Sequence, residues 1–265
     1  MKKQILSILL GITIIASASV STAFAETADS KGSIETAELL KTAIASYMKD
    51  GALSEREEAQ IRAVATEDAV SELMQEKLDA AADLLNSADL TPGMERLADG
   101  TEYAVQTYDL GDGCQMTVEL TDQAEGLQSG TVVAPLAAAS TGIWKDYGNR
   151  YFTAKTTVTV AGYSVMLSLE NHYILSSSGI DENYGVSIGT SESVKCSVTK
   201  GTYVIEDSAA RTPGTSDVNM YCTFTCKSGA KESKYKLDTT VQYLEHDTSG
   251  KRIKVGHTWK LTKLS

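Results

Sequence analysis

One serine lies in a sequence that is typical of a catalytic nucleophile. Residues 185–189 read GVSIG and match the G-x-S-x-G pattern of serine hydrolases, with Ser187 as the nucleophile. In those enzymes a strand precedes the serine and a helix follows it. Here residues 190–194 lead into another strand-like segment. We therefore interpret the match as a loop or strand and predict no catalytic role for Ser187.

Histidine could supply a base, a proton carrier or a metal ligand, and the chain has three. His172 follows Glu170 by two residues on the polar face of a strand-like segment. Such a pair could bind a metal or a proton, but it is also common on solvated strands. His257 falls on an apolar face and is expected to pack, while the neighbours of His246 point in different directions. The sequence predicts no catalytic residue, metal site or cofactor.

Four cysteines are present, at positions 114, 196, 222 and 226. No C-x-x-C pair occurs and no Cys/His cluster has zinc-ligand spacing, so structural zinc is disfavoured. Cys222 and Cys226 are four residues apart on one predicted strand, about 13 Å, which is too far for a mutual bridge. We predict that Cys196 pairs with Cys222 or Cys226 if the chain meets an oxidising environment. Free buried thiols are the alternative.

Aromatic residues gather late in the chain. Nine of the twelve tyrosines and both tryptophans follow residue 142. Trp144, Tyr147 and Tyr151 cluster in the sequence, and Tyr184 and Tyr221 are expected on outer strand faces. Amphipathic rings of this kind suit the binding of sugars or peptides, although tyrosine is also a good strand former. These five residues are the predicted binding residues.

The first 25 residues have the three parts of a secretory signal peptide. Lys2 and Lys3 precede an apolar stretch from residue 5 to about residue 20, and Ala23 and Ala25 match the A-x-A pattern before a cleavage site. An uncleaved anchor is the alternative, but a transmembrane helix needs about 20 apolar residues. We expect no membrane span after residue 25. The mature protein is predicted to be secreted, either extracellular or loosely associated with the envelope.

Charge is divided unevenly along the chain. Residues 26–122 carry 22 Asp and Glu against 7 Lys and Arg, whereas residues 123–265 carry 13 against 15. Because phosphate contacts need clustered Lys and Arg, so acidic a chain is not expected to bind nucleic acid. Basic residues within 227–236 and 251–263 could contact an anionic wall polymer or the protein's own acidic helices.

Hydrophobic spacing predicts helices before residue 90. Ser33 is expected to cap a helix that continues to about residue 49. Ser54 and Glu57 form a capping box that opens a second helical stretch, whose apolar stripe runs to about residue 86. Residues 66–68 either interrupt this stretch or cap a new helix. The region is predicted to be an acidic helical hairpin.

The period then changes from 3.6 to 2 residues. A hairpin over residues 99–122 keeps its apolar residues on one face if its loop has three residues, with Gly113 left-handed and Leu110 opposite Cys114. Residues 123–142 are predicted to be a linker or crossover. Residues 143–265 contain repeated strand-like segments and indicate an antiparallel β-sandwich or barrel. Among them, a turn at residues 200–201 is expected to separate short strands at residues 194–198 and 202–205. The predicted fold class is α+β, with helical residues 26–98 preceding the β region.

We recognise no characterised family in these motifs. The leading hypothesis is a non-catalytic extracellular or envelope-associated module that binds a glycan, a wall polymer or another protein. One alternative is a secreted hydrolase that uses His172 with nearby carboxylates. Another is a secreted effector or antimicrobial factor whose helical part is a removable pro-segment.

Overall fold

The computed structural model describes residues 33–48, 53–87, 93–97, 99–126, 142–192, 196–229 and 231–265. The predicted signal peptide and most of the predicted linker lie outside these residues. The chain from Ile34 to Ser265 forms one compact unit. The predicted helical region, hairpin and later strands therefore pack together within this unit.

Three helices come first: α2 (Ala37–Tyr47), α3 (Glu55–Val64) and α4 (Glu67–Ser87). The predicted capping box is confirmed, because the Ser54 side chain accepts from the Glu57 backbone and the Glu57 side chain accepts from the Ser54 backbone. Thr66 caps α4 by accepting from the Ala69 backbone N–H, so residues 66–68 begin a new helix. The prediction of Ser33 as the first cap is wrong. Thr36 caps α2, with its Oγ1 3.3 Å from the Leu39 backbone nitrogen.

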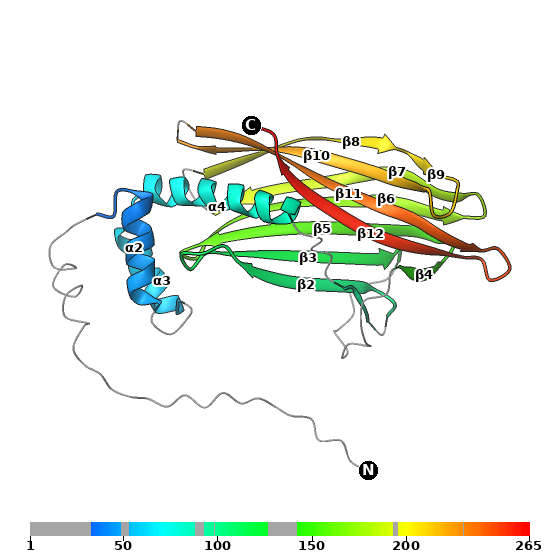
Figure 1. Cartoon of the computed structure of the whole chain (residues 1–265), viewed down its shortest axis with the longest axis horizontal. Helices are drawn as coiled ribbons and strands as arrows, with labels where there is room; N and C mark the ends of the chain where they lie inside the picture. Colours follow the sequence, from blue (N-terminus) through cyan, green and yellow to red (C-terminus); the bar gives the residue numbers. More distant parts are fainter. Residues whose placement is uncertain are drawn as a thin grey trace, which may run out of the picture. The chain divides into compact units, whose positions relative to one another are not determined.

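Two antiparallel sheets follow and pack face to face, which confirms the β-sandwich (Figure 1). Neither sheet closes into a barrel in the described part of the chain. The seven-stranded sheet has, in spatial order, β1 (Glu95–Arg96), β2 (Glu102–Asp109), β3 (Gln115–Ala124), β5 (Gly148–Val160), β6 (Tyr163–Ser176), β7 (Gly179–Ser191) and β9 (Ala209–Ala210). The five-stranded sheet has β4 (Ile143–Asp146), β12 (Arg252–Lys263), β11 (Lys231–Asp247), β10 (Ser216–Ser228) and β8 (Cys196–Asp207).

The β2–β3 hairpin has the predicted three-residue loop. Tyr108 lies opposite Met116, and the Leu110 backbone N–H donates to the Cys114 carbonyl at 2.9 Å. Gly113 has a φ of 67°. A Cβ there would lie 2.7 Å from Ile44, so both the conformation and the space favour glycine.

One strand prediction needs correction. Residues 200–201 do not form a turn between two short strands, because β8 runs without a break from Cys196 to Asp207. Instead, the register between β8 and β10 shifts between Cys222 and Phe224. The irregularity that the sequence suggests at this point is therefore a bulge within one strand.

The two ends of the sandwich differ. At one end, left in Figure 1, the helices lie beside the turns at residues 110–114 and 161–162 and beside Lys231; we name this the helix end. Leu73, Met74 and Leu78 of α4 are buried in the same apolar core as both sheets. The opposite end contains β4, the start of β5 and the β11–β12 turn at residues 248–251; we name this the polar end.

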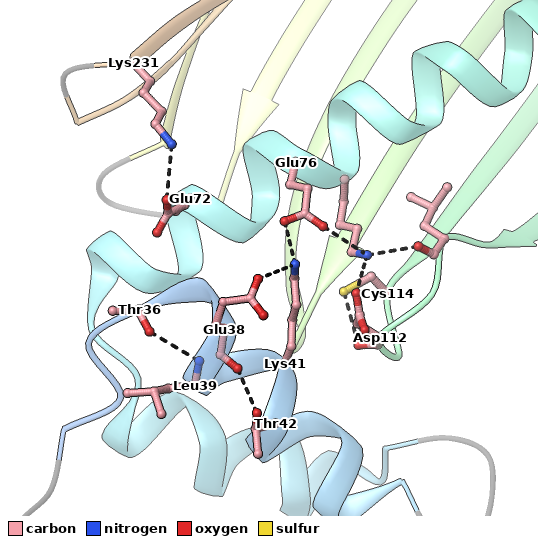
Figure 2. A network of polar contacts seen from close by, with 12 residues as sticks. Thr36, Glu38, Leu39, Lys41, Thr42, Glu72, Glu76, Asp112, Cys114 and Lys231 are labelled. Atoms are coloured by element: carbon pink, nitrogen blue, oxygen red, sulfur yellow. Dashed lines mark hydrogen bonds and ion pairs between the residues drawn. The ribbon is translucent and has the colours of Figure 1, made fainter.

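Ion pairs attach α4 to its neighbours at the helix end (Figure 2). Lys41 of α2 contacts Glu76 at 2.7 Å, and Lys77 contacts Asp112 in the β2–β3 loop at 2.7 Å. Lys231, beside the β10–β11 turn, contacts Glu72 at 3.2 Å. Lysines 231 and 263 each form an ion pair with an acidic residue of α4. These two lysines therefore contact the acidic helix α4. Contact with the protein's own helices is one of the two predicted alternatives for the basic residues, beside contact with an anionic wall polymer.

Candidate functional site

Charged side chains are buried between the sheets at the polar end. Glu102 of β2 and Asp122 of β3 point inward from the seven-stranded sheet, and Lys145 of β4 points inward from the five-stranded sheet. All three side chains are fully buried. The Lys145 Nζ lies 2.5 Å from Glu102 Oε2 and 2.7 Å from Asp122 Oδ2. One lysine therefore joins two carboxylates across the sandwich.

Asp122 is the centre of this cluster. Arg150 Nε donates to its Oδ1 at 2.8 Å. The Tyr173 hydroxyl donates to its Oδ2, and His257 Nε2 contacts the same oxygen. Strands β5, β6 and β12 supply these three partners. The six residues together form the buried ionic cluster: Glu102, Asp122, Lys145, Arg150, Tyr173 and His257.

Burial and charge shift several pKa values in this cluster. Burial alone would raise the pKa of Asp122, but Lys145, His257 and Arg150 outweigh it and hold that pKa well below its usual range. Burial lowers the pKa of Lys145, although both carboxylates oppose this effect. Burial and the nearby Lys145 charge lower the pKa of His257, although the charge of Asp122 opposes this effect. Such clustered shifts are typical of functional sites and also of structural ion networks.

A pocket of about 390 Å³ lies over this cluster. Its lining combines charged, aromatic and glycine residues: Arg96, Asp99, Gly100, Ala124, Trp144, Lys145, Asp146, Tyr147, Gly148, Asn149, Arg150 and Arg252. Lys145 and Arg150 belong to both the pocket lining and the buried cluster. Arg150 Nη2 is buried and has no hydrogen-bond partner within the described residues. We name this the polar-end pocket.

Neighbouring contacts hold the pocket walls in place. The Arg252 guanidinium lies 5.6 Å from the centroid of the Trp144 ring, and its Nη2 contacts Asp247 at 2.9 Å. Arg96 Nη2 lies 3.1 Å from Glu102 Oε1 and donates to the Trp144 carbonyl at 3.1 Å. The Tyr147 hydroxyl lies 2.5 Å from a ring nitrogen of His246. The walls are therefore preorganised before any ligand enters.

A smaller pocket of about 30 Å³ shares Asn149 and Arg150 with the polar-end pocket. His172 lies there between two tyrosines, with ring centroids 4.2 Å from Tyr151 and 3.9 Å from Tyr184. Its Nε2 lies 2.5 Å from Glu170 Oε1, as the spacing of this pair suggests. Its Nδ1 is buried and has no hydrogen-bond partner in the parts of the chain that the structure describes.

The five predicted binding residues fall into three places. Trp144 and Tyr147 line the polar-end pocket, and Tyr151 and Tyr184 enclose His172. Tyr221 lies apart from them, on the outer face of β10, with Lys236 Nζ 4.3 Å from its ring centroid. The structure thus brings four of the five close to two adjoining pockets.

Ser187 lies within β7, where it is buried and followed by more strand. This placement agrees with the loop-or-strand interpretation of the GVSIG segment. A nucleophile elbow needs a helix directly after the serine, whereas β7 continues to Ser191.

The predicted disulfide of Cys196 with Cys222 or Cys226 is not present, because all four cysteines are buried free thiols, as the alternative had it. Cys226 lies opposite Val198, two residues from Cys196. Cys196 lies opposite Ser228 and Cys222 lies opposite Tyr203. Six residues of β10 therefore separate the two positions, which is about 20 Å along a strand. Burial raises the pKa of the Cys226 thiol to about 12.

Sequence reasoning missed five members of the buried cluster: Glu102, Asp122, Lys145, Arg150 and Tyr173. A signal was present, because Asp122 continues the inward alternation of Met116, Val118 and Leu120. Arg150 likewise has the same phase as Phe152. A charged residue at an inward strand position indicates a buried charge with a partner.

No helix in the described residues is both long and apolar enough to cross a bilayer. Within the same residues, no cluster of three or more His, Cys, Asp or Glu side chains could hold a metal ion. A comparison with protein-family models found no match, and neither did comparisons with curated proteins and with solved structures.

Proposed function

We propose that the protein is an exported, non-catalytic binding module that holds a glycan in the polar-end pocket. The observation that carries this proposal is the composition of that pocket, in which Trp144 and Tyr147 stand beside Asp146, Asn149 and Arg252. Sugar rings offer apolar C–H faces and many hydroxyl groups. Aromatic rings can cover the former, and mixed donors and acceptors can bind the latter.

Size and charge support the same choice. A volume of about 390 Å³ is within the range of about 300–1,000 Å³ for small-ligand sites. Four cationic residues and two carboxylates line the pocket, and Glu102 and Asp122 lie behind it. Because these charges nearly balance, the surroundings favour a ligand rich in hydroxyl groups over a strongly charged one. The unpartnered Arg150 Nη2 is a candidate donor to such a ligand.

The predicted signal peptide indicates where the protein would encounter its ligand. An exported protein encounters the polymers of the envelope, so a cell-wall polysaccharide is the proposed target class. The protein would be extracellular or loosely attached to the envelope through this binding.

The test is a glycan array combined with a cell-wall pull-down, using the wild type, Trp144→Ala and Tyr221→Ala. We expect Trp144→Ala to weaken binding at least about tenfold, as for a central aromatic contact. Tyr221→Ala is the matched control, since it removes an aromatic ring far from the pocket, and it should bind like the wild type. Wild-type protein that binds no glycan and no wall preparation would contradict the proposal.

A secreted hydrolase is the second candidate, and the pairing of Glu170 with His172 favours it. Glu170 contacts Nε2 of His172, and both His172 and Glu125 are among the residues that line the smaller pocket. This geometry could hold a proton during bond cleavage. Incubation with the glycans retained in the binding assay would distinguish the two functions, because a hydrolase releases shorter products and His172→Gln would abolish that release.

A further inference from the structure

The contact of Lys145 with two carboxylates differs from the other lysine ion pairs of the protein. Lys155 contacts Glu119 at 2.7 Å, but its side chain is 36% exposed. Lys145 contacts Glu102 and Asp122 at similar distances with all three side chains at 0% exposure. The amine and both carboxyl groups are thus held together without solvent between the two sheets.

Burial changes the chemistry available to such a pair. Two separate charges are costly in a dry interior, so the neutral amine and neutral acid become more accessible than in water. In agreement with this, burial lowers the pKa of Lys145. A neutral amine has a free electron pair and is a nucleophile. Exclusion of water also favours condensation over hydrolysis.

We propose that Lys145 and Asp122 form an intramolecular amide bond between their side chains, with Glu102 as the proton carrier. Lys145 Nζ lies 2.7 Å from Oδ2 of Asp122, beside the carboxyl carbon that it would attack, and 2.5 Å from Oε2 of Glu102. The proposal does not depend on glycan binding.

The reaction balances without any other reactant. A proton passes from the Lys145 ammonium to the carboxylate of Glu102, which gives the neutral amine, because the neighbouring cations hold the pKa of Asp122 low. As the Nζ electron pair forms a bond to Cγ of Asp122, Glu102 gives this proton to Oδ2 of Asp122 and then accepts one proton from the nitrogen. Glu102 returns that proton to the departing oxygen, the C–O bond breaks, and one water molecule leaves. No group is oxidised or reduced.

Asp122 is better placed than Glu102 to be the acyl partner. Arg150 Nε donates to Oδ1, and Tyr173 donates to Oδ2. These donors stabilise the negative charge that develops on the oxygens when the amine adds, as an oxyanion hole does. After water leaves, Oδ1 stays bound to Arg150 as the amide oxygen. Glu102, by contrast, forms a salt bridge with Arg96, whose side chain is 48% exposed.

The bond would fix the floor of the polar-end pocket. It would join β3 in one sheet to β4 in the other, at the end of the sandwich that the helices do not cover. A covalent cross-link of this kind limits the unfolded chain and so stabilises the folded one. Lys145 also lines the pocket, so the cross-link would hold the walls beside Trp144 in place.

Mass spectrometry of the purified, folded wild-type protein tests the proposal. The intact mass should be lower by one water molecule than the mass of the mature sequence. Cleavage after glutamate would separate residues 120–125 from residues 126–170 in an unlinked chain. We expect these two peptides to remain joined, with fragment ions that place the link between Asp122 and Lys145.

Internal and variant controls complete the experiment. Lys155, whose ion pair with Glu119 is partly exposed, should remain unlinked. Glu102→Gln keeps the shape of the side chain but removes the proton acceptor, so it should restore the full mass. Full mass in the wild type, with residues 120–125 and 126–170 as separate peptides, would overturn the proposal. A link from Lys145 to Glu102 would overturn the assignment of Asp122, and loss of water in a chain with an unlinked Lys145 would also contradict it.

Discussion

The two ends of the sandwich are stabilised by different means. At the helix end, α4 places Leu73, Met74 and Leu78 in the apolar core, and most of its ion pairs lie near the surface. At the polar end, Glu102, Asp122 and Lys145 are buried where apolar side chains would be less costly. The difference suggests that the helix end serves mainly for stability. The polar end accepts a cost in desolvation, which is expected where a site must be held in a fixed geometry.

The largest expected effect is at the polar end. Lys145→Met removes the only side chain that joins Glu102 to Asp122 among the described residues, and with it the proposed amide bond. It should lower the free energy of unfolding by at least about 3–5 kcal/mol, because carboxylates are left buried with too few partners and the cross-link is lost. Denaturant titration measures this change. The double variant Lys145→Met/Glu102→Gln should recover part of the loss, and no recovery would show that charge is not the cause.

At the helix end, Leu73→Ala tests whether α4 is part of the core. Leu73 is fully buried, so its truncation should cost about 2–5 kcal/mol. Glycan binding by the fraction that remains folded should be unchanged. A loss below about 0.5 kcal/mol, the range of a surface substitution, would instead favour a helical region that can be removed as a pro-segment.

The pH dependence of the free energy of unfolding tests a further buried carboxyl group. Burial raises the pKa of Glu182 at the start of β7 to about 8, so the folded protein holds a proton that the unfolded chain loses near the ordinary glutamate pKa of 4.5. Stability from this group is complete below pH 4.5 and is lost as the pH rises to about 8. Glu182→Gln should flatten the decline of stability between these values. An unchanged slope in the variant would contradict this assignment.

The smallest expected effect concerns the surface. Lys231→Ala removes the ion pair with Glu72, in which the Lys231 side chain is 64% exposed and the Glu72 side chain is 48% exposed. Exposed pairs contribute about 0–1 kcal/mol, so the melting temperature should change little. A loss as large as that of Leu73→Ala would show that ion pairs, rather than apolar packing, attach α4 to the sandwich.

The sequence predicted the elements better than the site, for a physical reason. Local patterns define a capping box at Ser54 and a three-residue loop after Leu110, and both are confirmed. The strand alternation also predicted which faces are buried. By contrast, the meeting of Lys145 with Glu102 depends on which strands face each other across the sandwich, and no local pattern specifies that.

The cysteines and aromatics show the same limit. Cys196 and Cys222 are both buried, as their strand phase suggests, but the strand register keeps them apart. Trp144 and Tyr147 line a pocket, whereas Tyr221 lies on a different sheet face. Phase gives the direction of each side chain, but tertiary packing decides its neighbours.

The most direct test of the account is an NMR titration of the folded protein with a soluble cell-wall oligosaccharide. We predict that chemical shifts change for backbone amides around the polar-end pocket, including those of Trp144, Asn149 and Arg252. Amides of α4 and those around Tyr221 should not respond. Shift changes confined to the helix end or to the Tyr221 face, or no saturable change at any oligosaccharide concentration, would contradict the assignment of the polar end as the binding site.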